Sequence, residues 1–208
     1  MVFVSQTICV TDPGTVTLLD VGSYTMTVDG QGSATGSYAF NLVQVSAPQI
    51  FDIQLGDTVA LDAPSEGAGH IEEPGAIDIY RLPVQGGQEI CFDELDGPCN
   101  ISWSVSAPRG AAGFTNEVIC VGDRASVVMP TDGICTITVY GQQSAVGDYA
   151  FTTSLRTVAD LDGDCNVNAA DLAMLLGAWG PCRGCAADLD SSGSVDAADL
   201  AILLGSWE

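Results

Sequence analysis

The chain has 208 residues, with 5 basic side chains against 27 acidic ones and a formal net charge of −22. A protein with this charge repels phosphate backbones, which excludes nucleic acid as a partner and favours divalent cations or basic proteins. Hydrophobic residues make up 47% of the chain, enough for a packed core, and no apolar run is long enough to cross a membrane.

Eight cysteines and a single histidine indicate how the chain is stabilised. A set of zinc sites would need more histidines, so disulfides in a secreted or cell-surface protein are the better explanation. No signal peptide precedes the first strand-like segment. We therefore expect the chain to be the C-terminal part of a longer exported protein, with the signal peptide on a missing N-terminal part.

The first three quarters of the chain are rich in Gly, Ser, Thr and Val, and apolar residues alternate with polar ones. This alternation predicts strands, at residues 25–28, 77–80, 89–92, 101–105 and 136–139. Turn-forming pairs such as Gly86-Gly87 and Asp132-Gly133 separate the strands at short intervals. Such spacing is typical of an all-β sandwich.

A long internal repeat runs through this region at a constant offset of 111 residues. Residues 3–40 align without gaps on residues 114–151, and nothing before residue 3 matches the segment 47–112. The repeat therefore divides the chain into three parts. These are the C-terminal half of one β repeat at 1–46, a complete sandwich at 47–157 and a different domain at 158–208.

The complete repeat resembles the bacterial pre-peptidase C-terminal domain, on residues 74–92 and on the closing G-D-Y-A-F at 147–151. The resemblance implies a jelly-roll-like β-sandwich of the kind that secreted enzymes carry as a non-catalytic appendage. Some members of that family bind matrix polymers. With the last domain, the expected fold class is mainly β with a small α domain at the C-terminus.

The only histidine, His70, lies in a connector rich in Gly, Glu and Pro. A catalytic base needs an oriented partner and a nucleophile, and the sequence contains no motif that supplies them. We interpret His70 as a solvated loop residue and expect no catalytic residue in this chain. The acidic residues around it form either an extra calcium site or a solvated acidic connector. They are Glu66, Glu72, Glu73 and Asp78.

The last domain contains one pattern twice, at an offset of 28 residues. Each copy places oxygen-bearing side chains at positions 1, 3, 5, 9 and 12 of a loop, the arrangement that surrounds calcium with oxygen ligands. Position 7 adds its backbone carbonyl. The first predicted site is Asp160, Asp162, Asp164, the carbonyl of Asn166, Asn168 and Asp171. The second is Asp188, Asp190, Ser192, the carbonyl of Ser194, Asp196 and Asp199.

After each loop, leucines recur at helical spacing, so each unit is a loop followed by a helix. Val167 and Val195 occupy position 8, where paired calcium loops join through a short strand contact. Position 6, where the chain turns sharply, is Gly193 in the second loop but Cys165 in the first. The alternative to calcium is an acidic turn in which Asp171 and Asp199 only start their helices.

The tandem loop–helix units resemble the type I dockerin domain along their whole length. The resemblance implies two bound Ca²⁺ ions and a partner of the cohesin kind, or another protein of the cell surface. In that family the partner is recognised through loop positions 10 and 11 and helix positions 17 and 18. The corresponding residues are Ala169, Ala170, Leu176, Gly177, Ala197, Ala198, Leu204 and Gly205.

These observations predict a non-catalytic secreted module that serves protein–protein assembly or surface attachment. Familiar polar and basic recognition residues are missing from the docking positions. The near-identity of the two copies would allow a partner to dock in two orientations. The alternative is the C-terminal tail of a secreted hydrolase, such as a polysaccharide-degrading glycoside hydrolase or a protease, with its catalytic domain upstream. A third class, a structural surface protein that uses calcium only for stability, has no partner.

Spacing alone leaves the disulfides open, because eight cysteines allow 105 pairings. We expect Cys182 to pair with Cys185 in the linker between the two units, with Cys165 as the alternative partner of either. Local pairs are expected in the sandwich. They are Cys91 with Cys99 and Cys120 with Cys135, which leaves Cys9 unmatched.

Overall fold

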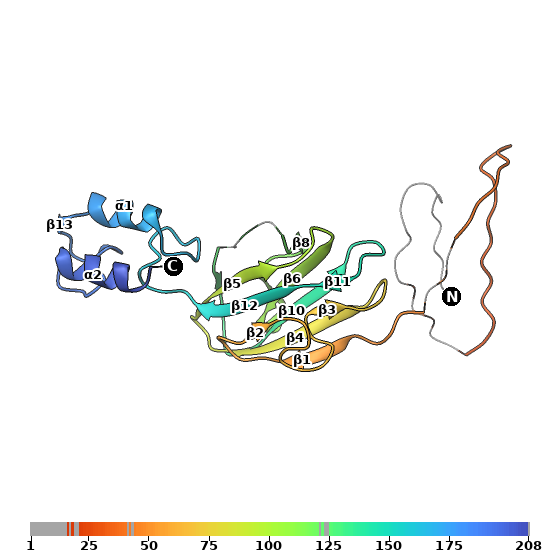
Figure 1. Cartoon of the computed structure of the whole chain (residues 1–208), viewed down its shortest axis with the longest axis horizontal. Helices are drawn as coiled ribbons and strands as arrows, with labels where there is room; N and C mark the ends of the chain where they lie inside the picture. Colours follow the sequence, from red (N-terminus) through yellow and green to blue (C-terminus); the bar gives the residue numbers. More distant parts are fainter. Residues whose placement is uncertain are drawn as a thin grey trace.

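The computed structural model describes residues 16, 18, 21–40, 42, 44–120, 122 and 125–207. A β-sandwich occupies the middle of the molecule, and a pair of short helices lies at its C-terminal end (Figure 1). Within the described residues, no helix is long and apolar enough to span a membrane. The fold is therefore mainly β with a small helical domain, as the sequence predicts.

The first sheet of the sandwich is built around two long antiparallel strands, β4 (Ile77–Val84) and β10 (Gly133–Gly141). The strand β1 (Gln49–Asp52) runs parallel to β4 and forms one edge. On the other side, β6 (Ile101–Ala107) pairs with β10 and carries two short strands, β7 (Ala111–Ala112) and β8 (Glu117–Val118).

The second sheet has the order β2 (Thr58–Val59), β12 (Ala150–Leu155), β5 (Glu89–Asp96), β9 (Val127–Val128). All its pairings are antiparallel. A separate two-stranded pair joins β3 (His70–Ile71) to β11 (Gly147–Asp148), and a short 3₁₀ helix, η1 (Pro108–Gly110), follows β6.

Alternating residues of both sheets fill the space between them. In β4, Tyr80, Leu82 and Val84 are buried while the residues between them reach the surface, the period expected of a strand with one face on the core. Aromatic rings occupy the centre, where Trp103 packs against Phe92 and Phe151. The strands predicted at 77–80, 89–92, 101–105 and 136–139 are therefore correct.

The predicted strand at 25–28 is wrong, and the repeat explains why. In the complete repeat, the equivalent residues lie in β10 and receive their hydrogen bonds from β4 and β6. Among the described residues, 21–40 have no such partner strands, so they form no strand and lie apart from both sheets (Figure 1). A strand pattern without partner strands does not become a strand, because its backbone groups have nothing to pair with.

Side chains at an offset of 111 residues show the same contrast. Met26 is 51% exposed, whereas its counterpart Ile137 is fully buried. Phe40 is 54% exposed, whereas Phe151 is fully buried. The same pattern of residues is thus core in one copy and surface in the other.

The C-terminal domain contains α1 (Ala169–Gly177), α2 (Ala197–Gly205) and two short strands, β13 (Gly180–Pro181) and β14 (Ser194–Val195). It has a small core of its own, centred on Val167, Leu175, Val195 and Leu203. The expected strand contact between Val167 and Val195 is wrong, because Val195 pairs with Gly180 of the linker instead. Both valines nevertheless bury their side chains in this core.

Three disulfides are present in the described part of the chain: Cys91–Cys165, Cys99–Cys120 and Cys182–Cys185. The linker pair is the one predicted, whereas both local pairs expected in the sandwich are wrong. An extended strand separates Cys91 from Cys99, and at about 3.3 Å per residue it carries them too far apart to be bridged. Cys135 is a free thiol buried in the core, and Cys9 lies outside the described residues.

Candidate calcium loops

The first loop brings three carboxylates to one point. Ligand oxygens of Asp160, Asp162 and Asp164 all lie within 4.8 Å of one another. Asp160 is buried at the base of the loop, and the other two side chains are exposed at its rim. Loop positions 1, 3 and 5 therefore converge as the spacing predicts.

Position 12 closes the first loop. The buried carboxylate of Asp171 accepts hydrogen bonds from the backbone N–H groups of Leu161, at 2.7 Å, and Asp162, at 3.2 Å. Its other oxygen accepts from the N–H of Asn168 at 2.8 Å, and Asn168 caps α1 in return through a bond from Ala170. Asp171 thus joins the start of the loop to the start of the helix.

The second loop repeats this arrangement. Asp199 is buried and accepts from the N–H groups of Leu189, Asp190 and Asp196 at 2.7, 3.2 and 2.8 Å. The oxygens of Asp188, Asp190 and Asp199 lie within 4.8 Å of one another. These backbone bonds lower the pKa of Asp199, so that its carboxylate is charged at neutral pH.

At position 6 both loops adopt the left-handed backbone that a sharp turn requires. The φ angle is +72° at Cys165 and +92° at Gly193. In each loop the N–H of this residue donates to the position 1 carboxylate, at 3.1 Å to Asp160 and 2.8 Å to Asp188. The turn therefore orients the first ligand of each loop.

The donor set fits calcium, a hard cation that takes oxygen ligands. The pKa of Asp162 is raised, because desolvation and the neighbouring charges of Asp164, Asp171 and Asp160 disfavour its ionised form. A divalent cation would remove this repulsion. The helix-start alternative explains Asp171 and Asp199, but it does not explain why positions 1 and 3 converge as well.

The remaining predicted ligands serve the loop backbone in this structure. Asp196 accepts from the N–H of Ala198 as the cap of α2, just as Asn168 does for α1. The hydroxyl of Ser192 donates to the carbonyl of Ser194 at 3.1 Å, and the amide of Asn166 donates to the carbonyl of Asp164 at 3.3 Å. At position 9 of the second loop, the carboxylate of Asp196 is not part of the cluster that Asp188, Asp190 and Asp199 form.

All eight predicted partner-binding residues are exposed. Those in the first unit are Ala169, Ala170, Leu176 and Gly177, and those in the second are Ala197, Ala198, Leu204 and Gly205. Sequence reasoning missed two further exposed residues, Trp179 and Trp207, which follow the two helices. Their place at the same position of both copies is a signal that the repeat contains.

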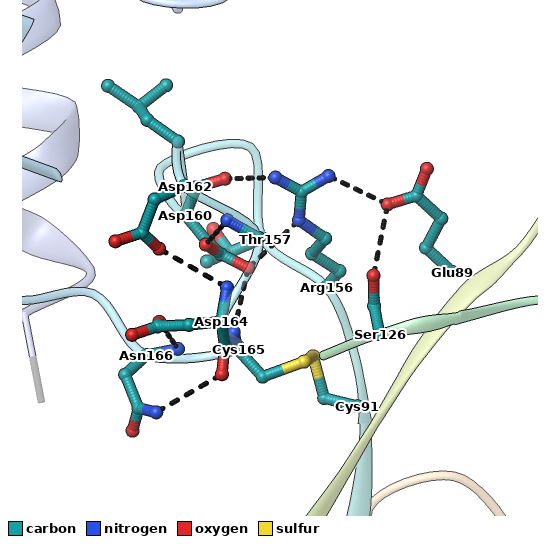
Figure 2. A network of polar contacts seen from close by, with 12 residues as sticks. Glu89, Cys91, Ser126, Arg156, Thr157, Asp160, Asp162, Asp164, Cys165 and Asn166 are labelled. Carbon is teal, nitrogen blue, oxygen red and sulfur yellow. Dashed lines mark hydrogen bonds and ion pairs between the residues drawn. A yellow bond between two sulfur atoms is a disulfide. The ribbon is translucent and has the colours of Figure 1, made fainter. Parts of the chain in front are cut away.

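Sequence reasoning also missed a connection between the first loop and the sandwich. Cys165 is bonded to Cys91 of β5, and Arg156, just after β12, lies between Glu89 and Asp160 (Figure 2). The guanidinium donates to the carboxylate of Glu89 at 2.8 Å and to that of Asp160 at 2.9 Å. A cysteine at a position that favours glycine was the only signal of this connection.

The interpretation of His70 as a solvated loop residue is wrong. It lies in β3, half-buried, and its Nδ1 lies 2.5 Å from a carboxylate oxygen of Asp148 in the paired strand β11. A hollow of about 500 Å³ beside it is lined by Gln49, Leu61, Asp62, Glu66, Gly67, His70 and Glu72. This lining offers no serine, threonine or cysteine nucleophile.

The four acidic residues near His70 do not converge within the described structure. Glu73 accepts a hydrogen bond from the backbone of Ser46, and Glu66 and Glu72 line the hollow. Asp78 is fully buried and accepts from the hydroxyl of Tyr149 at 2.5 Å, while its Oδ1 has no hydrogen-bond partner. Burial raises the pKa of Asp78 to about 6. Among the described residues, no three of these carboxylates form a cluster of the kind seen in the two loops.

No protein-family model matches the chain, and no curated protein does. Two similar solved structures each cover 52% of the chain. One is PliG of Aeromonas hydrophila, a periplasmic inhibitor of g-type lysozyme, at 17% identity, TM-score 0.36 and 99% coverage of that structure. The other is the pre-peptidase C-terminal domain of a collagenase from Bacillus anthracis, at 14% identity, TM-score 0.39 and 98% coverage. At such identities and TM-scores neither likeness bears on function.

Proposed function

We propose that this chain is a secreted, non-catalytic module in which two calcium loops stabilise a dockerin-like docking domain on a β-sandwich spacer. The observation that carries the proposal is the twofold convergence of carboxylates. Each loop gathers three of them within 4.8 Å. Like charges at this distance repel, so the loops need a cation for their full stability.

Calcium would be held in the first loop by Asp160, Asp162 and Asp164 and in the second by Asp188, Asp190 and Asp199. When bound, it neutralises the clustered carboxylates and fixes the start of each helix. The chain's own residues prepare the loops: Asp171 and Asp199 accept three N–H groups each and hold the loop ends together. Binding energy of the metal then adds to the stability of the domain.

Docking would use the exposed faces of the two units. Leu176 and Leu204 are 51% and 52% exposed at equivalent positions of the two helices. A partner suited to them presents apolar side chains to the leucines and basic side chains to the surrounding acidic surface, because the chain carries a net charge of −22. A cohesin-like protein of the cell surface is the partner class we propose.

The test is a calcium titration of the full chain after its metal has been removed with EGTA. We expect calcium to raise the melting temperature of the helical domain. At a free calcium concentration one hundred times Kd, binding at one site adds about 2.7 kcal/mol to the free energy of unfolding. The control is the variant with both Asp162→Ala and Asp190→Ala, two exposed residues whose loss leaves the packing intact. A native chain whose helicity and melting temperature ignore calcium would contradict the proposal.

A second arm tests docking with a set of recombinant cohesins. Binding measured by calorimetry is expected in calcium and lost in EGTA. Leu176→Asp combined with Leu204→Asp is expected to abolish binding without changing calcium affinity, because both side chains lie outside the metal loops. Failure of every cohesin to bind would contradict the docking part and leave the calcium part standing.

A further inference from the structure

The two calcium loops differ in what surrounds them. The first is attached to the sandwich by a disulfide that joins residues 74 positions apart, Cys91 in β5 and Cys165 at position 6 of the loop. Cys91 is buried against the sandwich, so the turn of the loop is fixed to a rigid strand. A covalent link of this length restricts the loop strongly relative to a free chain.

Arg156 makes a second connection at the same place. Its N–H donates to the carbonyl of Glu89, the first residue of β5, and its side chain pairs with the carboxylate of that residue at 2.8 Å. The other side of the guanidinium donates to Asp160 twice, at 2.9 Å to the carboxylate and at 2.5 Å to the carbonyl. One arginine thus joins the start of β5 to the first ligand of the loop (Figure 2).

Both connections act on the same atom. Oδ2 of Asp160 accepts hydrogen bonds from Arg156 and from the N–H of Cys165. The two donors belong to residues that are themselves anchored on β5, one by an ion pair and the other by a disulfide. The orientation of the Asp160 carboxylate is therefore set from the sandwich and not from within the loop alone.

In the second loop the equivalent carboxylate has local partners only. Within the described structure, Asp188 accepts from the N–H groups of Ser192 and Gly193, both in its own loop. Position 6 is Gly193, so no disulfide can form there. The second loop also gathers three carboxylates, those of Asp188, Asp190 and Asp199, but it lacks these contacts with the sandwich.

We propose that the sandwich and the C-terminal domain jointly build the first calcium site, with Arg156 and the Cys91–Cys165 disulfide as positioning groups for Asp160. The inference rests on the proposed calcium function and extends it, since it makes one of the two sites depend on the neighbouring domain. Outer groups that orient a metal ligand typically account for about 10–100-fold in metal affinity. The second site is independent of the sandwich.

The first variant combines Cys91→Ala with Cys165→Gly. Glycine is the residue that best tolerates the left-handed backbone of position 6, so the change removes the cross-link without straining the turn. Calcium affinity is measured by calorimetry in two single-site backgrounds. Asp190→Ala isolates the first site and Asp162→Ala isolates the second. We expect the first site to weaken about tenfold and the second to keep its affinity.

The second variant, Arg156→Gln, leaves the disulfide in place and removes the link between Glu89 and Asp160. We again expect weaker binding at the first site only. Arg109→Gln is the control, because Arg109 is an exposed arginine of the sandwich, in η1. Near-ultraviolet circular dichroism, to which Trp103 at the centre of the sandwich contributes, verifies that each variant retains its fold.

Equal loss at both sites, or no loss at the first, would overturn the joint site while the proposed calcium function stands. A higher affinity in Arg156→Gln would also overturn the positioning role, because it would show that Arg156 only opposes the charge of the metal. A native chain that binds no calcium at either loop would overturn the proposed function, and this inference with it. The four outcomes are distinguishable in one set of titrations.

Discussion

The two calcium loops have nearly the same backbone geometry but different neighbours. At position 12, the three backbone hydrogen bonds have the same lengths in both, 2.7, 3.2 and 2.8 Å. At position 6 they part, because Cys165 ties the first loop to the sandwich while Gly193 leaves the second free. The geometry of each loop is therefore determined within its own stretch of about twelve residues. The stability of each loop depends in addition on its contacts with the rest of the chain.

The difference also shows how a non-glycine residue is tolerated at a left-handed position. An L-residue there costs about 1–2 kcal/mol relative to a right-handed conformation. In the first loop, the same residue that carries this cost forms a disulfide with a strand 74 residues away in sequence. In the second loop no such bond compensates, and glycine occupies the position.

The largest expected effect comes from replacing the aspartate at position 12, which should destabilise the two loops to different extents. Asp199→Ala deletes the cap of three N–H groups and a metal ligand, a loss of about 3–5 kcal/mol for the second unit in excess calcium. Asp171→Ala removes the same bonds, but the disulfide still holds the first loop closed. Thermal unfolding followed by far-ultraviolet circular dichroism is therefore expected to show the greater loss for Asp199→Ala.

The control is the same thermal unfolding in EGTA. Without calcium, any loss of stability comes from the missing cap and not from the missing metal ligand. The gap between the variants is expected to close when Cys91→Ala and Cys165→Gly are added to the Asp171→Ala chain. Identical melting temperatures for Asp171→Ala and Asp199→Ala would contradict the claim that the disulfide stabilises the first loop.

A smaller effect is expected from Gly193→Ala. The φ of +92° disfavours alanine by about 1–2 kcal/mol, and an added Cβ would meet only the side chain of Arg183, at an ordinary 3.5 Å. The cost is therefore conformational and should appear as a lower melting temperature of the second unit. Gly205→Ala in α2 is the matched control, since an added Cβ there meets nothing within 4 Å and its φ is not left-handed. A neutral Gly193→Ala would contradict the left-handed turn.

The smallest expected effect is a pH dependence of the stability of the sandwich, the domain to which only the first loop is attached. Burial raises the pKa of Asp78 to about 6 from the model-compound value of 3.8, against a hydrogen bond from Tyr149 that opposes the shift. The nearby charge of Glu72 raises it further, and His70 lowers it. A carboxyl group whose pKa is raised by folding binds more protons in the folded state, so folding stability falls as the pH rises through that pKa.

Between pH 5 and pH 7 the sandwich is therefore expected to lose about 1 kcal/mol of stability. The loss would be read from the denaturant midpoint of near-ultraviolet circular dichroism in a Trp179→Phe and Trp207→Phe background, which leaves Trp103 as the only tryptophan. Asp78→Asn should remove most of this pH dependence. A midpoint that rises over this range would contradict the burial argument.

Local patterns in the sequence predicted much of the fold and both loops. Alternation placed β4 and β10, and the spacing of acidic residues placed the oxygens of Asp160 and Asp188 where they converge. The failures are all long-range. The strand at 25–28 needed partners that the half repeat lacks, and the bond between Cys91 and Cys165 joins elements that only the folded chain brings together.

The contacts of Asp78 and His70 were harder to predict from the sequence. Asp78 lies on the same face of β4 as Tyr80 and Leu82, although in the sequence it groups with the acidic residues around His70. Its hydrogen-bond partner Tyr149 lies 71 residues further along the chain, so the pattern of β4 alone could not reveal the contact. His70 was missed for the same reason, because its partner Asp148 lies 78 residues further along the chain.

The buried thiol of Cys135 affects the thiol chemistry of the folded chain. Burial raises its pKa to about 11, and it is fully enclosed in β10 between both sheets. Thiol–disulfide exchange proceeds through the thiolate, so a thiol of this kind is withdrawn from the reaction once the sheets have packed. Packing of the sandwich therefore protects Cys135 from exchange with the Cys91–Cys165 disulfide.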